Sequence, residues 1–147
     1  MISKQKGDIA EQAAVLRLLE LGWGVSKPVG DRLPYDLIAD TNGTLIRLQV
    51  KSAWFNKHDQ NFCIDVRRTK TNRRQMLRSL YQNEDFALVY LSEIRIFYVI
   101  PVTAFISFGS TISLVEADKR QRKPKSAIYR ENFELISLWA ASKEILV

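Results

Sequence analysis

The sequence predicts a mixed α/β domain in which a central β-sheet is flanked by helices. An Asn42-Gly43 pair separates two segments of alternating polarity, which is the strongest short-range signal for a β-hairpin. Two continuous apolar runs, residues 86–91 and 96–100, are rich in β-formers and typical of buried strands. Apolar residues also recur at the helical period over residues 7–21, which predicts a helix before the hairpin.

The remaining elements follow in order along the chain. The first helix ends at Gly22, and the second apolar strand ends at Pro101, because glycine stops helices and proline cannot donate to a strand ladder. Between and beyond these elements we expect a short strand at 23–25, the hairpin over 36–52, a strand at 62–67, a helix at 72–81, a short helix at 102–105, a weak strand at 113–115 and a helix at 130–136.

Length and composition indicate one domain, residues 1–147, with a core that needs no disulfide. The single cysteine, Cys63, excludes an internal disulfide and fits a reducing compartment; we expect it to be a small buried hydrophobe. The first residues do not resemble a signal peptide, and no apolar segment approaches the length of a membrane span. We therefore expect a soluble, cytoplasmic protein with no membrane partner.

The hairpin brings three polar residues together. If Asn42 and Gly43 form a two-residue turn, counting back along both strands pairs Asp36 with Gln49. Lys51 then lies on the diagonal, within reach of a long side chain. The alternation agrees, because Asp36, Gln49 and Lys51 fall on one face and the apolar residues of both strands fall on the other.

These residue types suit metal-dependent phosphodiester hydrolysis. Such a reaction needs an activated water and neutralisation of charge on the phosphate, and a divalent metal ion supplies both. Mg²⁺ prefers oxygen ligands, which Asp36, the Gln49 amide and the Val50 backbone carbonyl could provide. Lys51 would lie beside the attacking water.

The order of these motifs resembles the PD-(D/E)XK nuclease superfamily. Pro34-Tyr35-Asp36 is similar to its first acidic motif with one inserted residue, and Gln49-Val50-Lys51 is similar to its acid-x-lysine motif. The segment from Gly7 to Glu11 resembles the glycine-acid helix of Holliday-junction resolvases. Across nearly its whole length the chain is similar to cyanobacterial homing endonucleases encoded within group I introns.

The resemblance implies a restriction-endonuclease-like core and a site formed by Glu11, Asp36, Gln49 and Lys51. The superfamily usually has a second acid where this chain has Gln49. A neutral amide still binds a hard cation, though more weakly, and Glu11 is a candidate to restore the missing negative charge. The resemblance implies that Mg²⁺ is the cofactor and that Mn²⁺ substitutes for it.

The charge distribution points to a polyanionic partner. Lysine and arginine balance acids, eight against eight, through Val66, whereas fourteen bases face eight acids from Arg67 onward. Two basic runs hold half of all bases, and we expect them to contact DNA phosphates and not merely to form solvated faces. They comprise Arg67, Arg68, Lys70, Arg73, Arg74 and Arg78, and Lys119, Arg120, Arg122, Lys123 and Lys125.

The sequence therefore predicts a metal-dependent, sequence-specific double-strand DNA endonuclease of the homing type. Two alternatives stay open, namely a junction resolvase and a catalytically inactive DNA-binding module of the same fold. One site cuts one strand, so we expect a homo-oligomer, either a dimer or a dimer of dimers. The apolar segment 135–147 is a candidate interface, and core packing explains it equally well.

Overall fold

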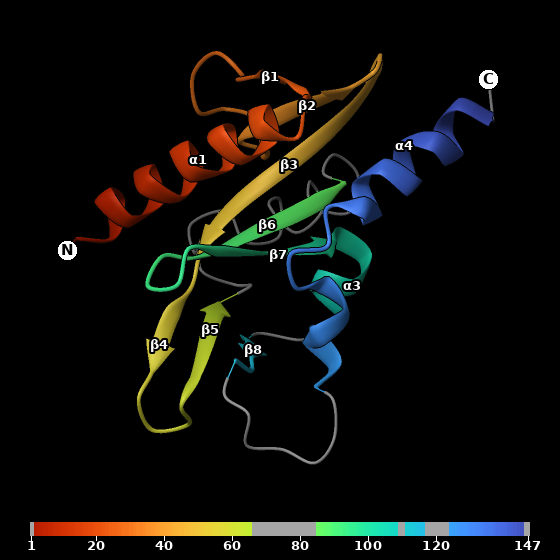
Figure 1. Ribbon diagram of the computed structural model, residues 1–147. Coiled ribbons are helices and arrows are strands. Elements are labelled where there is room, and N and C mark those ends of the chain that lie inside the picture. The colour runs from red at the N-terminus through yellow and green to blue at the C-terminus, as the bar shows by residue number, and fades with distance from the viewer. Residues whose placement is uncertain (1, 66–84, 109–110, 117–123, 146–147) are drawn as a thin grey trace.

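The computed structural model describes residues 2–65, 85–108, 111–116 and 124–145. Their elements begin with one helix, seven strands follow it, and helices and a further strand complete the order (Figure 1). They are α1 (Ser3–Glu20), β1 (Gly24–Ser26), β2 (Leu37–Thr41), β3 (Thr44–Ser52), β4 (Trp54–Asn56), β5 (Asn61–Asp65), β6 (Phe86–Leu91), β7 (Ile96–Pro101), α3 (Val102–Ser107), β8 (Thr111–Leu114), the 3₁₀ helix η1 (Lys125–Tyr129) and α4 (Glu134–Ile145).

A five-stranded mixed sheet forms the centre of the molecule, with strand order β1-β2-β3-β6-β7. Its neighbours pair antiparallel except for β3 and β6, which run parallel. All six residues of β6 are buried, as expected for a strand that is covered on both faces. The prediction of a mixed sheet flanked by helices is confirmed.

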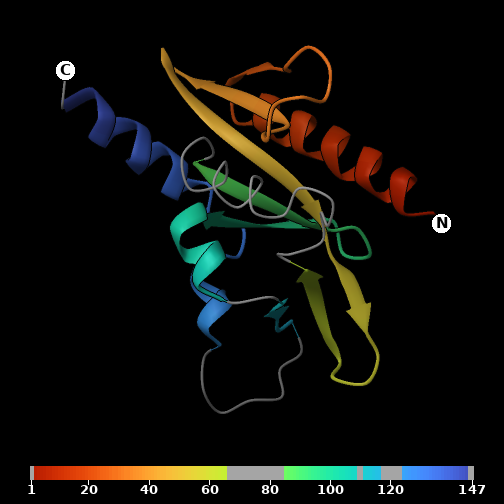
Figure 2. The ribbon, with the colours of Figure 1, turned by 180° about the vertical axis from the view of Figure 1, so that it is seen from behind.

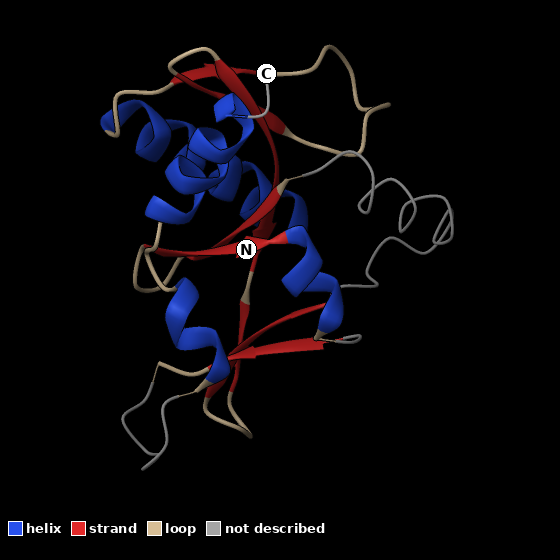
Figure 3. Cartoon of the chain, turned by 90° about the vertical axis from the view of Figure 1, so that its right-hand side faces the viewer, coloured by secondary structure: helices blue, strands red, loops and turns tan. Residues whose placement is uncertain are grey.

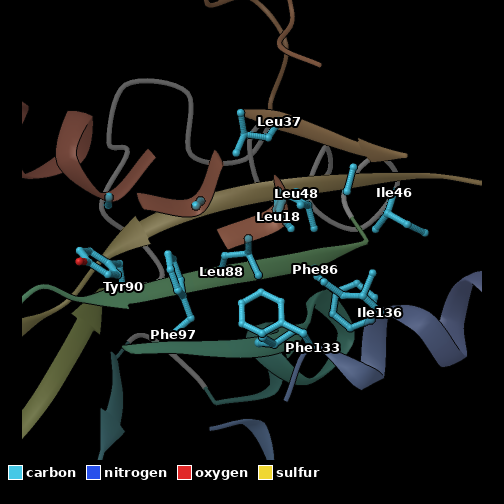
Figure 4. Close-up of a cluster of buried hydrophobic side chains, with 14 of the residues drawn as sticks. Leu18, Leu37, Ile46, Leu48, Phe86, Leu88, Tyr90, Phe97, Phe133 and Ile136 are labelled. Atoms are coloured by element: carbon cyan, nitrogen blue, oxygen red, sulfur yellow. The ribbon is translucent and has the colours of Figure 1, made fainter. Parts of the chain in front are cut away.

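Helices α1 and α4 cover one face of the central sheet and lie on either side of β3 in Figures 1 and 2. The buried side of α1 is Ala10, Ala14 and Leu18, which are spaced four residues apart and so share one face. Figure 4 shows Leu18 among the sheet residues Leu37 and Leu48. Because α1 is packed through small residues, its backbone lies close to the strands that carry the hairpin.

The opposite face packs against α3 and a second, three-stranded sheet of order β4-β5-β8. This small sheet lies below the central one in Figures 1 and 3. Phe105 from α3 and Ile112 from β8 are fully buried there. Cys63 is buried in β5, as the sequence predicts. No helix in the described ranges is long and apolar enough to cross a membrane.

The helix expected at 130–136 is wrong in its position. Arg130 follows η1 and forms an isolated bridge with Tyr98, and Glu131 has a left-handed backbone with φ 51°. The Glu131 carboxylate accepts a hydrogen bond from the Phe97 amide at 2.6 Å. This tertiary contact holds the segment out of a helix, which begins instead at Glu134.

Other differences are smaller. The short strand β4 was not predicted, and β8 is the weak strand shifted to Thr111–Leu114. The helix expected at 72–81 lies outside the described residues. The apolar carboxy-terminal segment forms α4, which has a buried and an exposed face. Ile136 and Ala140 are buried, while Leu138 and Trp139 are exposed. It therefore contributes to the core and also presents apolar surface.

Candidate active site

The candidate site is built on the β2–β3 hairpin. Asn42 and Gly43 have φ of 57° and 99°, the positive values that a two-residue type I′ turn requires. Thr41 pairs with Thr44 and Leu37 with Leu48, which is the register that the Asn-Gly turn predicts. Continued by one residue beyond β2, this register sets Asp36 opposite Gln49. Asp36 itself precedes β2, and its amide donates to the Leu48 carbonyl at 2.9 Å.

The Asp36 carboxylate is held in place by the backbone of β3. Its Oδ2 accepts a hydrogen bond from the Val50 amide at 2.8 Å. Burial raises the pKa of Asp36 above its ordinary value, and the negative charge of Glu11 adds to this rise. The Val50 hydrogen bond and the nearby charges of Lys51 and Lys27 oppose it. A bound cation would therefore relieve an unfavourable charge at this position.

Gln49 is the most unusual polar residue of the hairpin. It is 8% exposed, and its Oε1 has no hydrogen-bond partner among the described residues. An unsatisfied buried oxygen costs the free energy of its lost hydration. A ligand that binds this oxygen would recover that cost.

Lys51 follows two residues later on the same face of β3. The parallel pairing places Gln49 beside Ala87 and Lys51 beside Val89 of β6, so both are positioned by a buried strand. Lys51 is partly exposed, and its charge acts on Asp36. The pairing of β3 with β6 therefore fixes the backbone positions of Gln49 and Lys51 relative to each other.

Glu11 extends from α1 to the same place. Its carboxylate forms an ion pair with Lys27, and it is near enough to Asp36 to influence that carboxyl electrostatically. The ion pair with Glu11 raises the pKa of Lys27. Lys27 was not predicted from the sequence, because it matches no motif and only the pairing of β1 with β2 brings it to the site.

The donor set fits a hard divalent cation. The described residues contain no cluster of three His, Cys, Asp or Glu that could hold a metal ion. They do offer two carboxylates that act on each other, from Asp36 and Glu11, and the unpartnered amide oxygen of Gln49 on the neighbouring strand. Oxygen donors of this kind suit Mg²⁺ or Mn²⁺ and not a soft metal.

Most of the basic residues that we expect to contact DNA lie outside the residues that the structure describes. Lys125 is exposed at the start of η1. The other ten lie outside the described residues, namely Arg67, Arg68, Lys70, Arg73, Arg74, Arg78, Lys119, Arg120, Arg122 and Lys123.

The chain is similar in sequence and fold to a known protein family and to solved structures. A family model described as PD-(D/E)XK endonuclease matches residues 1–136. No curated protein sequence matches the chain. The chain is similar to the solved structure of a bacterial homing endonuclease, I-Ssp6803I, with 49% identity, 99% of each chain covered and a TM-score of 0.87. A Holliday junction resolvase, Hjc of Archaeoglobus fulgidus, is 16% identical over 67% of this chain and 74% of that one, with a TM-score of 0.45.

Proposed function

The chain belongs to the PD-(D/E)XK endonuclease family, and from this premise we propose that it is a homing-type enzyme that cuts both strands of a specific DNA sequence with Mg²⁺ as its cofactor. One observation carries the proposal of a working metal site. The Oε1 of Gln49 is buried without a partner in the described structure, at the register position opposite the Asp36 carboxylate. This oxygen supports a working site over a decayed one, because a bound cation would offset the cost of burying it.

Four groups would hold the metal ion, namely the carboxylates of Asp36 and Glu11, the amide oxygen of Gln49 and the backbone carbonyl of Val50. When bound, the ion would polarise the scissile phosphate and lower the pKa of the attacking water. Asp36 is already oriented by the Val50 amide, so little rearrangement is needed. Lys51 would orient the water and neutralise charge that develops on the phosphate.

Double-stranded DNA is the substrate that we propose. The homing activity named for I-Ssp6803I and the excess of fourteen bases over eight acids beyond Val66 support it. We propose that the run from Arg67 to Arg78 and the run from Lys119 to Lys125 contact the phosphate backbone.

We further propose that the enzyme works as a homo-oligomer, either a dimer or a dimer of dimers, since one site hydrolyses one strand. Exposed Leu138 and Trp139 on α4 line a groove with Pro101 and Thr103, which is a candidate contact surface. Sedimentation at the assay concentration is the measurement. A monomer that makes double-strand breaks at a concentration-independent rate would contradict this assembly.

The decisive experiment compares DNA substrates and metal ions. Purified protein is incubated with a library of linear duplexes or with a four-way junction, in Mg²⁺, in Mn²⁺ or in chelator. We expect double-strand cleavage of particular duplex sequences, with either metal and not in chelator. Preferential cleavage of the junction would indicate a resolvase, and duplex binding without any cleavage would indicate an inactive module.

A further inference from the structure

Lys27 belongs to the site by position although it belongs to no motif. It follows the last residue of β1, the edge strand beside β2, and Pro28 comes directly after it. A residue before proline favours an extended backbone, so the chain continues in the direction of the strand. Because Ser26 pairs with Ile38, this continuation brings Lys27 toward the start of β2, where Asp36 lies.

Lysines of the chain itself offset the negative charge of the acids at the site. The Lys27 ammonium is paired with the Glu11 carboxylate, and the charges of Asp36 and Asp8 also act on it. Around the hairpin, the negative charges of Glu11 and Asp36 face the positive charges of Lys27 and Lys51. A divalent cation that binds both carboxylates must therefore compete with a cation that the protein itself supplies.

We propose that Lys27 is a positioning residue. Its ammonium pairs with the Glu11 carboxylate in the metal-free enzyme and is displaced from it when the metal ion binds. This inference rests on the proposed metal site and adds a residue that tunes its affinity. The Lys27 charge offsets part of the repulsion between the Glu11 and Asp36 carboxylates. The Lys27 side chain is 52% exposed and that of Glu11 26%, so the ammonium can move into solvent when it leaves.

The test measures metal binding and not cleavage. Metal-free protein is titrated with Mn²⁺ by calorimetry in the absence of DNA. An ion pair as exposed as this one contributes little, so we expect Lys27→Met to bind Mn²⁺ about two- to fivefold more tightly than the wild type. Lys27→Arg keeps the pair and should bind like the wild type. Lys57→Met removes the same charge from the exposed β4–β5 turn and should leave the affinity unchanged.

The same comparison in a Glu11→Gln variant separates competition for Glu11 from a general electrostatic effect of Lys27. In Glu11→Gln the ion pair is absent, so adding Lys27→Met should change the Mn²⁺ affinity little. A Lys27→Met protein that binds Mn²⁺ no more tightly than the wild type would overturn the inference, as would an equal gain in the Glu11→Gln background. If the wild type itself binds no Mn²⁺, the proposed metal site fails together with the inference; if only the differences are missing, the inference alone fails.

Discussion

Gln49 combines burial, an unpartnered amide oxygen and a place opposite a carboxylate. Each property is unremarkable alone, since buried amides occur in many cores. Together they support our proposal that Gln49 is a metal ligand whose position is set by the hairpin register. The same hairpin lets the Asp36 carboxylate accept a hydrogen bond from the Val50 amide. One turn at Asn42-Gly43 therefore orients two of the proposed ligands.

The first prediction concerns the charged residues of the site. Asp36→Asn and Lys51→Ala should each lower the cleavage rate at least about a hundredfold, because one loses a metal ligand and the other the cation at the water. DNA binding, measured by gel shift, should stay close to that of the wild type. Asp40→Asn is the matched control, since Asp40 is exposed near the end of β2 and asparagine keeps an oxygen that can accept the hydrogen bond from the Gly43 amide. Wild-type cleavage by either site variant would contradict the assignment.

A second prediction uses the three chemistries available at position 49. Gln49→Glu should keep cleavage activity and bind metal more tightly, because a carboxylate replaces an amide as ligand. Gln49→Leu has a similar volume and no oxygen, so it should lose cleavage while its thermal stability stays equal or rises. Calorimetric Mn²⁺ titration and thermal melts test both variants. Equal metal affinity in all three proteins would show that the amide is not a ligand.

The third prediction follows from the raised pKa of Asp36. At neutral pH the buried charge of Asp36 costs the metal-free native state free energy, and protonation removes this cost as pH falls through the raised pKa. Asp36→Asn should therefore be more stable than the wild type at pH 7, and the difference should shrink toward acidic pH. Urea unfolding in chelator at several pH values measures it. A difference that does not change with pH would contradict the prediction.

At the scale of elements, Glu131 joins α1 to the central sheet. Its carboxylate accepts from the Phe97 amide of β7 and pairs with Arg17 of α1. The Arg17 guanidinium also lies 5.5 Å from the centre of the Phe97 ring and 5.3 Å from that of Phe133. Because α1 also carries Glu11, this contact helps to hold a proposed metal ligand in place.

We predict that Glu131→Ala lowers the free energy of unfolding by about 2 kcal/mol, because the Phe97 amide and Arg17 lose a charged partner. Arg17→Met should cost less alone, and the double variant should cost less than the sum of both. Denaturant unfolding measures these values, with exposed Glu134→Ala as the control. Strict additivity would mean that the two residues act independently.

At the scale of the whole molecule, the two sheets and their helices form two parts with different proposed roles. The central sheet carries the candidate site between α1 and β3, while the small sheet β4-β5-β8 extends from its other face (Figure 3). Lys125 lies at the start of η1, and η1 follows β8 in the chain. We expect the DNA surface to reach from the hairpin toward this part of the molecule.

The prediction at this scale is electrostatic. Neutralising a pair such as Lys123 and Lys125, or Arg73 and Arg74, should weaken DNA binding and make it less dependent on salt. Each lost phosphate contact should reduce the slope of log K against log salt by about 0.9. Exposed Arg95, which belongs to neither run, serves as a control when changed to glutamine. Unchanged slopes for both pairs would show that these residues only form solvated faces.

Local signals in the sequence determined the hairpin register, the buried strands and the family resemblance. The Asn-Gly turn and the alternation around it defined a register that put Asp36 opposite Gln49, since strand periodicity and turn geometry act over few residues. The buried strands β6 and β7 were predicted from the sequence for the same reason. The resemblance to a nuclease superfamily also needed only short motifs in a fixed order.

Only the tertiary structure decided the contacts between distant segments. The helix expected at 130–136 begins only at Glu134, and Glu131 has a left-handed backbone, because the Phe97 amide and Arg17 hold the Glu131 carboxylate from other elements. Lys27 joined the site because β1 pairs with β2 and so brings it beside Glu11 of α1. Such pairings depend on how elements pack, and no local preference of the chain at these positions encodes them.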